Sequence, residues 1–253
     1  MNQQNKIALV TGGSRGLGKN EALSLAQNGI DVIITFNEQK NEANEVVAAI
    51  KELGQRSFAL QLNTSDPLGF TDFKNRLSST LKELWNSDHF DFLINNAGVG
   101  SLASFEQTTE EQLDRLYQIH FKGVFLLTQA LLPLIADGGR IVNTSTGLTR
   151  FSNPGYAAYA SMKGAVETLT KYMAKELGKR QINVNLVAPG IIATDFTKET
   201  RERPGLVEFI SSQTALGRIG QPDDIGGVVA FLCSDAARWI NAQRIEVSGG
   251  MFL

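Results

Sequence analysis

The chain has 253 residues and a formal net charge of -2, with 42% hydrophobic and 20% charged residues. These proportions are typical of a globular protein and exclude a disordered or fibrous chain. The near balance of acids and bases argues against a nucleic-acid-binding surface, and no apolar run is long enough to cross a membrane.

Short β-branched runs alternate with longer segments of helical periodicity along almost the whole chain. The expected strands are Ile7–Val10, Val32–Phe36, Phe58–Leu62, Phe92–Asn95, Arg140–Asn143, Asn183–Val187 and Arg244–Val247. The expected helices are Leu17–Asn28, Glu42–Leu53, Leu68–Leu84, Glu110–Ile135, Tyr156–Leu177 and Asp224–Ser234. Strands that are apolar on successive residues are typical of a sheet covered on both faces. The pattern therefore predicts an α/β fold with a doubly wound, seven-stranded parallel sheet and helices on both faces.

One segment departs from this alternation. Between Ile191 and Gly217, charged residues surround a few hydrophobes, so this stretch is expected to leave the core and to act as a lid over a substrate. The chain contains no repeat, no low-complexity tract and no linker rich in proline, glycine or serine. We therefore expect residues 1–253 to form a single domain, with 191–217 as an excursion from it.

A glycine-rich loop follows the first strand and opens the first helix. It has the sequence Thr11-Gly12-Gly13-Ser14-Arg15-Gly16-Leu17-Gly18. Glycines at such points allow a tight turn and bring backbone N–H groups close to a pyrophosphate, which the helix N-terminus also attracts. A glycine cluster alone also fits a simple strand–helix turn, but its place in the first βαβ unit favours dinucleotide binding in a Rossmann fold.

The end of the second strand indicates which dinucleotide is bound. Sites selective for NAD usually carry an acid there, which bonds the ribose 2′-OH. Here the strand ends Thr35-Phe36-Asn37, and Glu38 comes one step later. Arg15 is placed to meet a 2′-phosphate, for which a planar guanidinium is well suited, although it is also compatible with a solvated loop residue. The sequence favours NADP(H) over NAD(H).

A tyrosine and a lysine share one face of a predicted helix, because Tyr159 and Lys163 are four residues apart. A phenol must lose about three pKa units, or about 4 kcal/mol, to act as a base near neutral pH. One ammonium at ~4 Å, with an effective dielectric constant of ~20, supplies about that much. The pair alone is common on protein surfaces, so its meaning depends on the other motifs.

Four motifs occur in a characteristic order: the glycine loop, Asn95-Asn96-Ala97-Gly98, the Tyr159/Lys163 pair, and Pro189-Gly190 after the sixth strand. In this order and spacing the chain resembles the short-chain dehydrogenase/reductase family from Lys6 to Gly250. The segments Gly217–Asp224 and Val247–Gly250 resemble the branch that contains 3-oxoacyl-acyl-carrier-protein reductases and related ketone reductases. The resemblance implies an NADP(H)-dependent oxidoreductase that moves a hydride between nicotinamide and a carbonyl or secondary alcohol carbon.

The resemblance also implies roles for single residues. Tyr159 is expected to be the general acid of reduction, and Lys163 to lower its pKa and hold the nicotinamide ribose. The glycine loop is expected to cradle the pyrophosphate, and the residues after the sixth strand to contact the nicotinamide. The expected cofactor-binding residues, besides Tyr159 and Lys163, are Gly12, Ser14, Arg15, Gly16, Leu17, Gly18, Asn37, Asn63, Thr64, Asn96, Ala97, Gly98, Pro189, Gly190, Ile192 and Thr194.

Two expected catalytic positions depart from the family pattern. The family usually has a serine 13 residues before the tyrosine, where this chain has Thr146, with Ser145 as the alternative partner of the substrate oxygen. An asparagine that usually holds a relay water near the lysine is replaced by His120. We expect His120 to be a neutral relay or packing residue. No metal site is expected, because the only other histidine, His89, is predicted in a surface loop.

These departures leave a second hypothesis open, a catalytically weak NADP(H)-binding regulator or scaffold. A nucleotide-sugar epimerase would need a Gly-x-x-Gly-x-x-Gly loop and a longer C-terminal substrate domain, and this chain has neither. The resemblance implies a homotetramer or homodimer that packs through the helices of 110–135 and 156–177. The N-terminus lacks the pattern of a secretion signal, and the one cysteine, Cys233, is expected in the core, so we expect a cytoplasmic protein.

Overall fold

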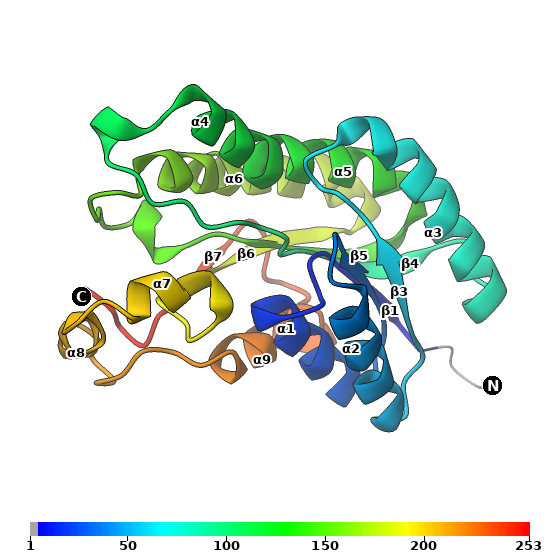
Figure 1. Ribbon diagram of the computed structural model, residues 1–253. Coiled ribbons are helices and arrows are strands. Elements are labelled where there is room, and N and C mark those ends of the chain that lie inside the picture. The colour runs from blue at the N-terminus through cyan, green and yellow to red at the C-terminus, as the bar shows by residue number, and fades with distance from the viewer. Residues whose placement is uncertain (1–4) are drawn as a thin grey trace.

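Seven strands lie at the centre of the computed structural model, which describes residues 5–253 (Figure 1). They form one sheet in the order β3-β2-β1-β4-β5-β6-β7, and every neighbouring pair is parallel. This topology confirms the predicted doubly wound Rossmann fold. The strands are β1 (Ile7–Val10), β2 (Asp31–Phe36), β3 (Ser57–Gln61), β4 (Phe90–Asn95), β5 (Ile135–Thr144), β6 (Asn183–Pro189) and β7 (Arg244–Val247).

Helices cover both faces of the sheet (Figure 1). One core joins α1, α2 and α9 to strand residues such as Val10, Ile34 and Val142, and the other joins α3, α5 and α6 to their sequence neighbours Leu9 and Ile141. Both faces are therefore buried, as the continuous apolar strands predict. The helices are α1 (Gly16–Gln27), α2 (Lys40–Glu52), α3 (Phe70–Trp85), α4 (Glu110–Tyr117), α5 (Gly123–Leu131), α6 (Ala157–Glu176), α7 (Lys198–Arg201), α8 (Leu206–Ser212) and α9 (Asp223–Leu232).

The prediction of one continuous helix over 110–135 is wrong, because the structure has two helices there and the second ends before residue 135. A π-helical turn, Gln118–Lys122, separates α4 from α5, and a 3-10 turn with Pro133 ends the helix. Proline lacks the N–H that a helix interior needs, so the chain leaves the helix there. Strand β5 begins at Ile135 and is longer than expected.

The segment 191–217 leaves the sheet. It contains a 3-10 turn, Asp195–Thr197, and the short helices α7 and α8, which lie beyond the sheet near the C-terminus (Figure 1). Single bridges join its two ends to the rest of the chain: Ile192 pairs with Gly220, and Thr214 pairs with Met251. Within residues 5–253, none of the helices has the length and apolar character needed to cross a membrane.

The carboxyl ends of the parallel strands meet at one edge of the sheet. The glycine loop follows β1, Asn96 follows β4, Ser145 follows β5, and Gly190 follows β6. Strand order reverses between β1 and β4, which opens a crevice at that edge. The fold thus gathers the polar segments singled out in the sequence at one place.

An acid is buried on the sheet-facing side of α1. Glu21 is 0% exposed, and neither of its carboxylate oxygens has a hydrogen-bond partner within the described residues. Burial raises the pKa of Glu21 from 4.5 to about 8, and attraction to the Lys163 ammonium opposes this rise. Glu21 is therefore a neutral carboxylic acid at neutral pH.

We expect Glu21→Gln to remove a pH dependence of stability. Because the folded pKa lies above the unfolded value, the contribution of Glu21 is fully present below pH 4.5 and is lost as the pH rises to about 8. The loss amounts to roughly 1.4 kcal/mol per pH unit across that window. Urea denaturation should give similar free energies of unfolding for both proteins at low pH, and a higher value for Glu21→Gln at pH 9.

The exposed Glu45 on α2 offers a control, because Glu45→Gln should have the same free energy of unfolding as the wild type at low pH and at pH 9. If the free energies of unfolding of the wild-type protein and of Glu21→Gln differ by the same amount at both pH values, Glu21 ionises as freely in the folded chain as in the unfolded one.

Candidate active site

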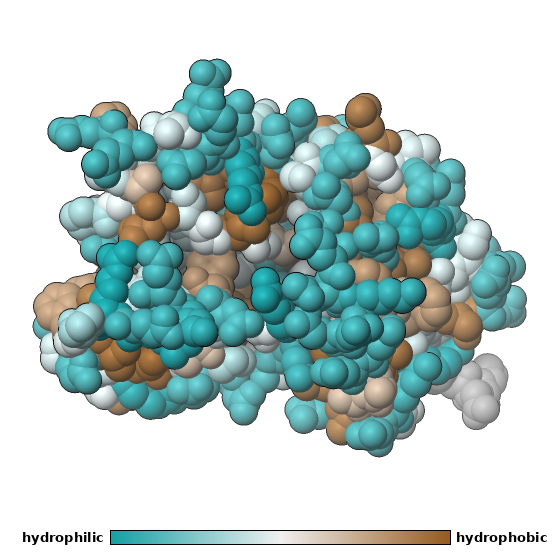
Figure 2. Space-filling model, in the orientation of Figure 1, coloured by the Kyte–Doolittle hydropathy of each residue, from teal (hydrophilic) through white to brown (hydrophobic). Residues whose placement is uncertain are grey.

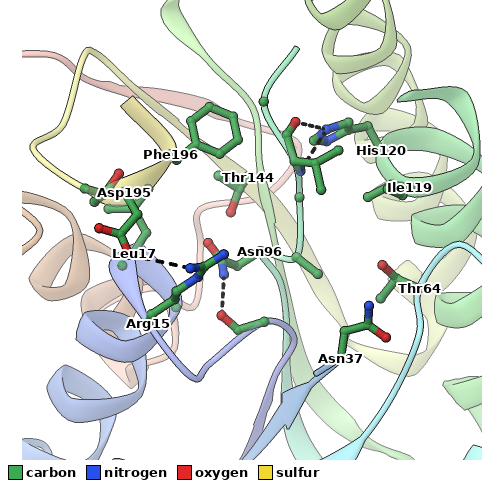
Figure 3. A pocket seen from close by; sticks show the side chains of 18 of the residues that line it. Arg15, Leu17, Asn37, Thr64, Asn96, Ile119, His120, Thr144, Asp195 and Phe196 are labelled. Carbon is green, nitrogen blue, oxygen red and sulfur yellow. Dashed lines mark hydrogen bonds and ion pairs between the residues drawn. The ribbon is translucent and has the colours of Figure 1, made fainter. Parts of the chain in front are cut away.

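A cavity of about 630 Å³ lies at the carboxyl edge of the sheet and contains every site residue expected from the sequence (Figure 3). Segments that follow six strands, β1 to β6, line it, together with residues of α6 and of the π-helical turn. The sequence missed several residues that also line the cavity: Val99, Gly100, Arg115, Ile119, Thr144, Asp195, Phe196 and Thr197. Most of these missed residues lie in segments that no motif marks.

The glycine loop approaches its neighbours more closely than any side chain allows. A Cβ at Gly18 would lie 2.3 Å from the carbonyl oxygen of Gly12 and 2.5 Å from Nδ2 of Asn96. Gly12 and Gly16 have φ values of +67° and +56°, which L residues with side chains rarely adopt. These glycines let α1 begin directly against the loop.

Two side chains hold the loop against the end of β4. Nδ2 of Asn96 donates to the carbonyl oxygens of Thr11 (3.0 Å) and Gly12 (3.3 Å). In return, Oγ1 of Thr11 accepts from the backbone N–H groups of Asn96 (3.0 Å) and Ala97 (3.1 Å). Asn96 lines the cavity, but its amide binds the protein itself. Thr11 was missed as a structural member of the site.

The N-terminus of α1 opens into the cavity without a side-chain cap. Its first N–H groups and the helix dipole therefore suit an anion such as a pyrophosphate. Arg15, the residue before this helix, lies across the cleft from the 191–217 segment, with Nη1 3.6 Å from Oδ2 of Asp195 (Figure 3). Both side chains are more than half exposed, so this ion pair is weak and Arg15 can turn toward a bound anion.

The other end of the cavity, beyond β2 and β3, is polar and has Asn37 at the position where an NAD-selective site carries an acid. Asn37 and Glu38 follow β2, and Asn63 and Thr64 follow β3. Oδ1 of Asn63 accepts from the backbone N–H (3.0 Å) and the hydroxyl (2.7 Å) of Ser65, which fixes the turn after β3.

Lys163 is buried beneath the middle of the cavity. Its Nζ donates to the carbonyl oxygen of Thr144 (2.7 Å) and lies 5.8 Å from the centre of the Tyr159 ring. Burial lowers the pKa of Lys163 from 10.5 to about 8, and attraction to Glu21 opposes this change. Lys163 is therefore mostly an ammonium at neutral pH, but it gives up its proton more easily than a solvated lysine.

The expected depression of the Tyr159 pKa by Lys163 is wrong for the structure as it stands. Burial raises the pKa of Tyr159 well above its ordinary value, and the group that opposes the rise is the hydrogen-bonding hydroxyl of Thr146. The ammonium lies against the ring and bonds Thr144, so it does not compensate for the lost hydration of a phenolate. The phenol is thus held in its neutral form.

The structure distinguishes the two hydroxyl candidates after β5. Thr146 is the neighbouring hydroxyl that lowers the pKa of Tyr159, and its Oγ1 accepts from the N–H of Leu148 (3.3 Å), which leaves its own proton to be donated. Ser145 donates instead to Oε1 of Glu167 (2.6 Å), away from the phenol. Thr146 is therefore the hydroxyl at the Tyr159 side of the cavity.

His120 is buried in the π-helical turn, 1% exposed, with its ring edge-to-face against Tyr159 at 5.1 Å between centroids. Its Nε2 lies 2.8 Å from the carbonyl oxygen and 3.3 Å from the backbone nitrogen of Val99 (Figure 3), and the shorter contact is a hydrogen bond when Nε2 carries the proton. Burial first, and then the Lys163 ammonium, lower the pKa of His120 to about 3. His120 is thus a neutral ring, and its Nδ1 is a buried acceptor without a partner within residues 5–253.

An apolar wall faces Tyr159 from the 191–217 segment. The ring of Phe196 lies 6.0 Å from that of Tyr159, and atoms of Phe196 come close to Gly100 on the opposite side. Figure 2 shows apolar side chains inside the hollow on this face and hydrophilic ones around its rim. Such a wall suits an uncharged group next to the phenol.

Comparison with known proteins places this geometry among reductases. Residues 12–252 match the family model for enoyl-(acyl carrier protein) reductase. The chain is 39% identical to 3-oxoacyl-(acyl-carrier-protein) reductase of Staphylococcus aureus, over 98% of both chains. Among solved structures, it resembles the angucycline C-6 ketoreductase LanV with bound NADP (TM-score 0.92, 36% identity, 98% of this chain and 95% of that one). It also resembles a short-chain dehydrogenase/reductase from Serratia marcescens (TM-score 0.90, 31% identity, 99% of both).

Proposed function

The chain belongs to the short-chain dehydrogenase/reductase family, and from this premise we propose that it is an NADP(H)-dependent reductase of ketones or 3-oxoacyl thioesters. Relatives with these names reduce a carbonyl group, and one of them has been solved with NADP bound. The observation that carries the proposal is that Tyr159, Lys163 and Thr146 line the same cavity as the glycine loop and the uncapped N-terminus of α1. A phenol that keeps its proton can donate it to a carbonyl oxygen, which is what carbonyl reduction requires.

The residues present fit the cofactor. The uncapped N-terminus of α1 and the glycine loop would hold the pyrophosphate, and Arg15 would meet the 2′-phosphate. Asn37, rather than an acid, stands at the end of β2, where a carboxylate would repel that phosphate. Pro189, Ile192 and the buried Lys163 would hold the nicotinamide end. The bound nicotinamide supplies the hydride.

The protein's own contribution is to polarise the carbonyl oxygen and to protonate it. Thr146 donates a hydrogen bond to the substrate oxygen, while Tyr159 transfers its proton to that oxygen as the hydride arrives. Lys163, whose pKa is about 8, can return a proton to the phenolate that remains. His120 offers Nδ1 as a neutral acceptor beside this pair, either for a relay water or only as a packed ring.

Phe196 and Val99, which both line the cavity, favour a substrate that is uncharged next to its carbonyl group. A ketone in a ring system and a 3-oxoacyl thioester both meet this condition, and a 2-oxo acid does not. The 191–217 segment would close over such a substrate as a lid, because it brings Phe196 to the cavity and is joined to the core near both of its ends.

The assembly proposed is a homotetramer or homodimer in the cytoplasm. Several large apolar side chains on the α4–α6 face remain exposed, among them Leu113, Phe125 and Tyr172. Val124, Leu127 and Val166 of the same helices lie in the core instead. The exposed residues are those that a second copy would cover.

We expect Tyr159→Phe to abolish turnover, because only the proton donor is removed. Its affinity for NADPH should stay within a few fold of wild type. NADPH consumption at 340 nm with ketones, aldehydes and 3-oxoacyl thioesters measures the first quantity, and fluorescence titration measures the second. Retention of about a tenth or more of the wild-type rate would contradict the role of Tyr159. An absence of turnover by the wild type on every substrate would favour a binding protein instead.

Arg15→Ala should weaken NADPH binding by roughly ten- to a hundredfold and NADH binding far less, since a bond to a charged group is typically worth ~1.5–3 kcal/mol. Asp195→Asn is the matched control, because it breaks the ion pair of Arg15 but leaves the guanidinium free for a phosphate. Titration with both nucleotides is the measurement. Equal losses for NADPH and NADH would remove Arg15 from 2′-phosphate recognition.

His120→Asn should keep or raise activity. With a pKa of about 3, His120 is neutral throughout the range from pH 5 to 9, so its removal should not change the shape of the kcat profile there. Initial rates across that range test the expectation. A fall on the order of a hundredfold would make His120 an essential catalytic group.

A further inference from the structure

A carboxylate continues the helix face that carries the proposed catalytic pair. Tyr159, Lys163 and Glu167 succeed one another at intervals of four residues on α6, so they lie one turn apart along one side of the helix. The side chain of Glu167 is 19% exposed. Neither the motifs of the sequence nor the proposed chemistry uses this residue.

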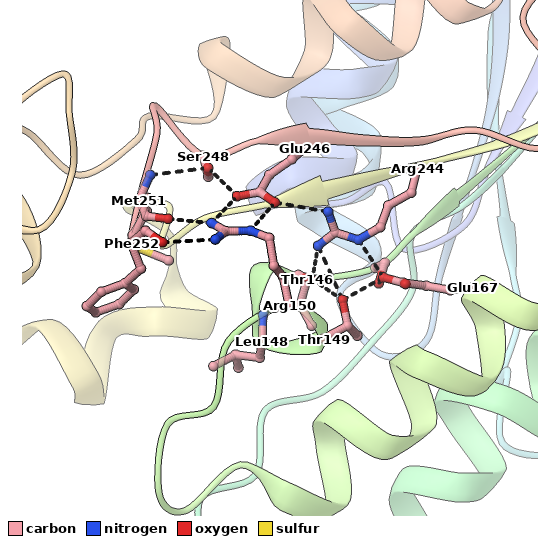
Figure 4. Close-up of polar contacts among 11 residues, drawn as sticks. Thr146, Leu148, Thr149, Arg150, Glu167, Arg244, Glu246, Ser248, Met251 and Phe252 are labelled. Carbon is pink, nitrogen blue, oxygen red and sulfur yellow. Dashed lines mark hydrogen bonds and ion pairs between the residues drawn. The ribbon is translucent and has the colours of Figure 1, made fainter.

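One oxygen of Glu167 receives three hydrogen bonds (Figure 4). Its Oε1 accepts from Oγ of Ser145 (2.6 Å), Oγ1 of Thr149 (2.6 Å) and Nε of Arg244 (2.9 Å). Ser145 directly precedes Thr146, and Thr149 ends the 3-10 turn that follows it. A single carboxylate oxygen thus fixes the chain on both sides of Thr146.

The backbone of Thr146 is held by the same group of residues. Nη2 of Arg244 donates to the carbonyl oxygen of Thr146 (3.1 Å), while Nε of this arginine is bound to Glu167. Oγ1 of Thr149 also lies 3.0 Å from that carbonyl oxygen, but it has one proton, which the shorter contact with the carboxylate takes. Arg244 therefore holds the carbonyl, and Glu167 holds Arg244.

The rest of the charged network does not depend on Glu167. Nη1 of Arg244 is 2.9 Å from Oε2 of Glu246, and Arg150 donates to both oxygens of Glu246 at 2.7 Å (Figure 4). Arg150 lowers the pKa of Glu246 to about 2, and Nη1 of Arg150 donates to the carbonyl oxygen of Phe252. Removing the charge of Glu167 should therefore leave strand β7 and residues 250–252 in place.

We propose that Glu167 is a positioning residue of the reaction, which acts through Ser145, Thr149 and Arg244 to aim the hydroxyl of Thr146 at the substrate oxygen and at Tyr159. This inference rests on the proposed function, because it assigns Thr146 to the substrate oxygen. It adds a residue that touches neither substrate nor cofactor. Helix α6, which carries Tyr159 and Lys163, thereby also sets the position of the Thr146 hydroxyl.

The test is a double-mutant cycle between Glu167→Gln and Thr146→Val, measured on the ketone or thioester that the wild type reduces fastest. Glu167→Gln alone should lower kcat by roughly tenfold or more, since a small misplacement of a reacting group can cost on the order of a hundredfold. It should leave the Kd for NADPH within about twofold. In the Thr146→Val background, the same change should alter kcat by less than about twofold, because no hydroxyl remains to be aimed.

Glu176→Gln, an exposed glutamate of the same helix, is the matched control and should behave as wild type in both backgrounds. Circular dichroism and thermal unfolding establish that each variant is folded. An unchanged kcat in Glu167→Gln overturns the proposal, as does an equal loss with and without Thr146, which indicates a general structural effect. If Thr146→Val alone is fully active, the assignment of Thr146 fails and this proposal fails with it. An active Tyr159→Phe, by contrast, refutes the proposed function itself.

Discussion

The amide of Asn96 joins the ends of β1 and β4, and the rest of the site depends on that junction. Its hydrogen bonds to the carbonyl oxygens of Thr11 and Gly12 lie at the base of the crevice, where the strand order reverses. Because no Cβ fits at Gly18, α1 begins within van der Waals contact of the same junction and directs its N-terminus into the cavity. The anion-binding end of the site is therefore built on this junction, and Tyr159 and Lys163 of α6 line the same cavity.

Burial is the main influence on every shifted ionisable group around the reacting centre. It raises the pKa values of Tyr159 and Glu21 and lowers those of Lys163 and His120, and in each case it favours the uncharged form. Neighbouring charges and hydrogen bonds modify these shifts without reversing them. Burial therefore keeps Tyr159 and Glu21 protonated and makes Lys163 a stronger acid than a solvated lysine. A positive charge that enters the cavity, such as that of an oxidised nicotinamide, would lower the pKa of Tyr159 again.

Sequence periodicity and motifs gave the order of elements, the parallel sheet and the set of residues that meet in the cavity. These predictions succeeded because the conformational preferences of glycine and of β-branched residues act locally along the chain. The predictions that failed depend on contacts between residues far apart in the sequence. Pro133 and the π-helical turn break the helix that periodicity predicts as continuous. Phe196 reaches the site because of the path of 191–217, which no local pattern encodes. The direction of the Tyr159 pKa shift depends on burial, which a four-residue spacing does not reveal.

The π-helical turn at Gln118–Lys122 has a consequence for how this site can change by insertion and deletion. A π-turn contains one residue more than the α-helical turn it replaces, and each residue of a helix advances the direction of its side chains by about 100°. Loss of the codon for Phe121 or Lys122 would therefore favour a regular helix and turn His120 by about 100° relative to α5. Its ring would then point away from Tyr159, although neither deleted residue lines the cavity. The length of this segment therefore carries as much functional information as its letters.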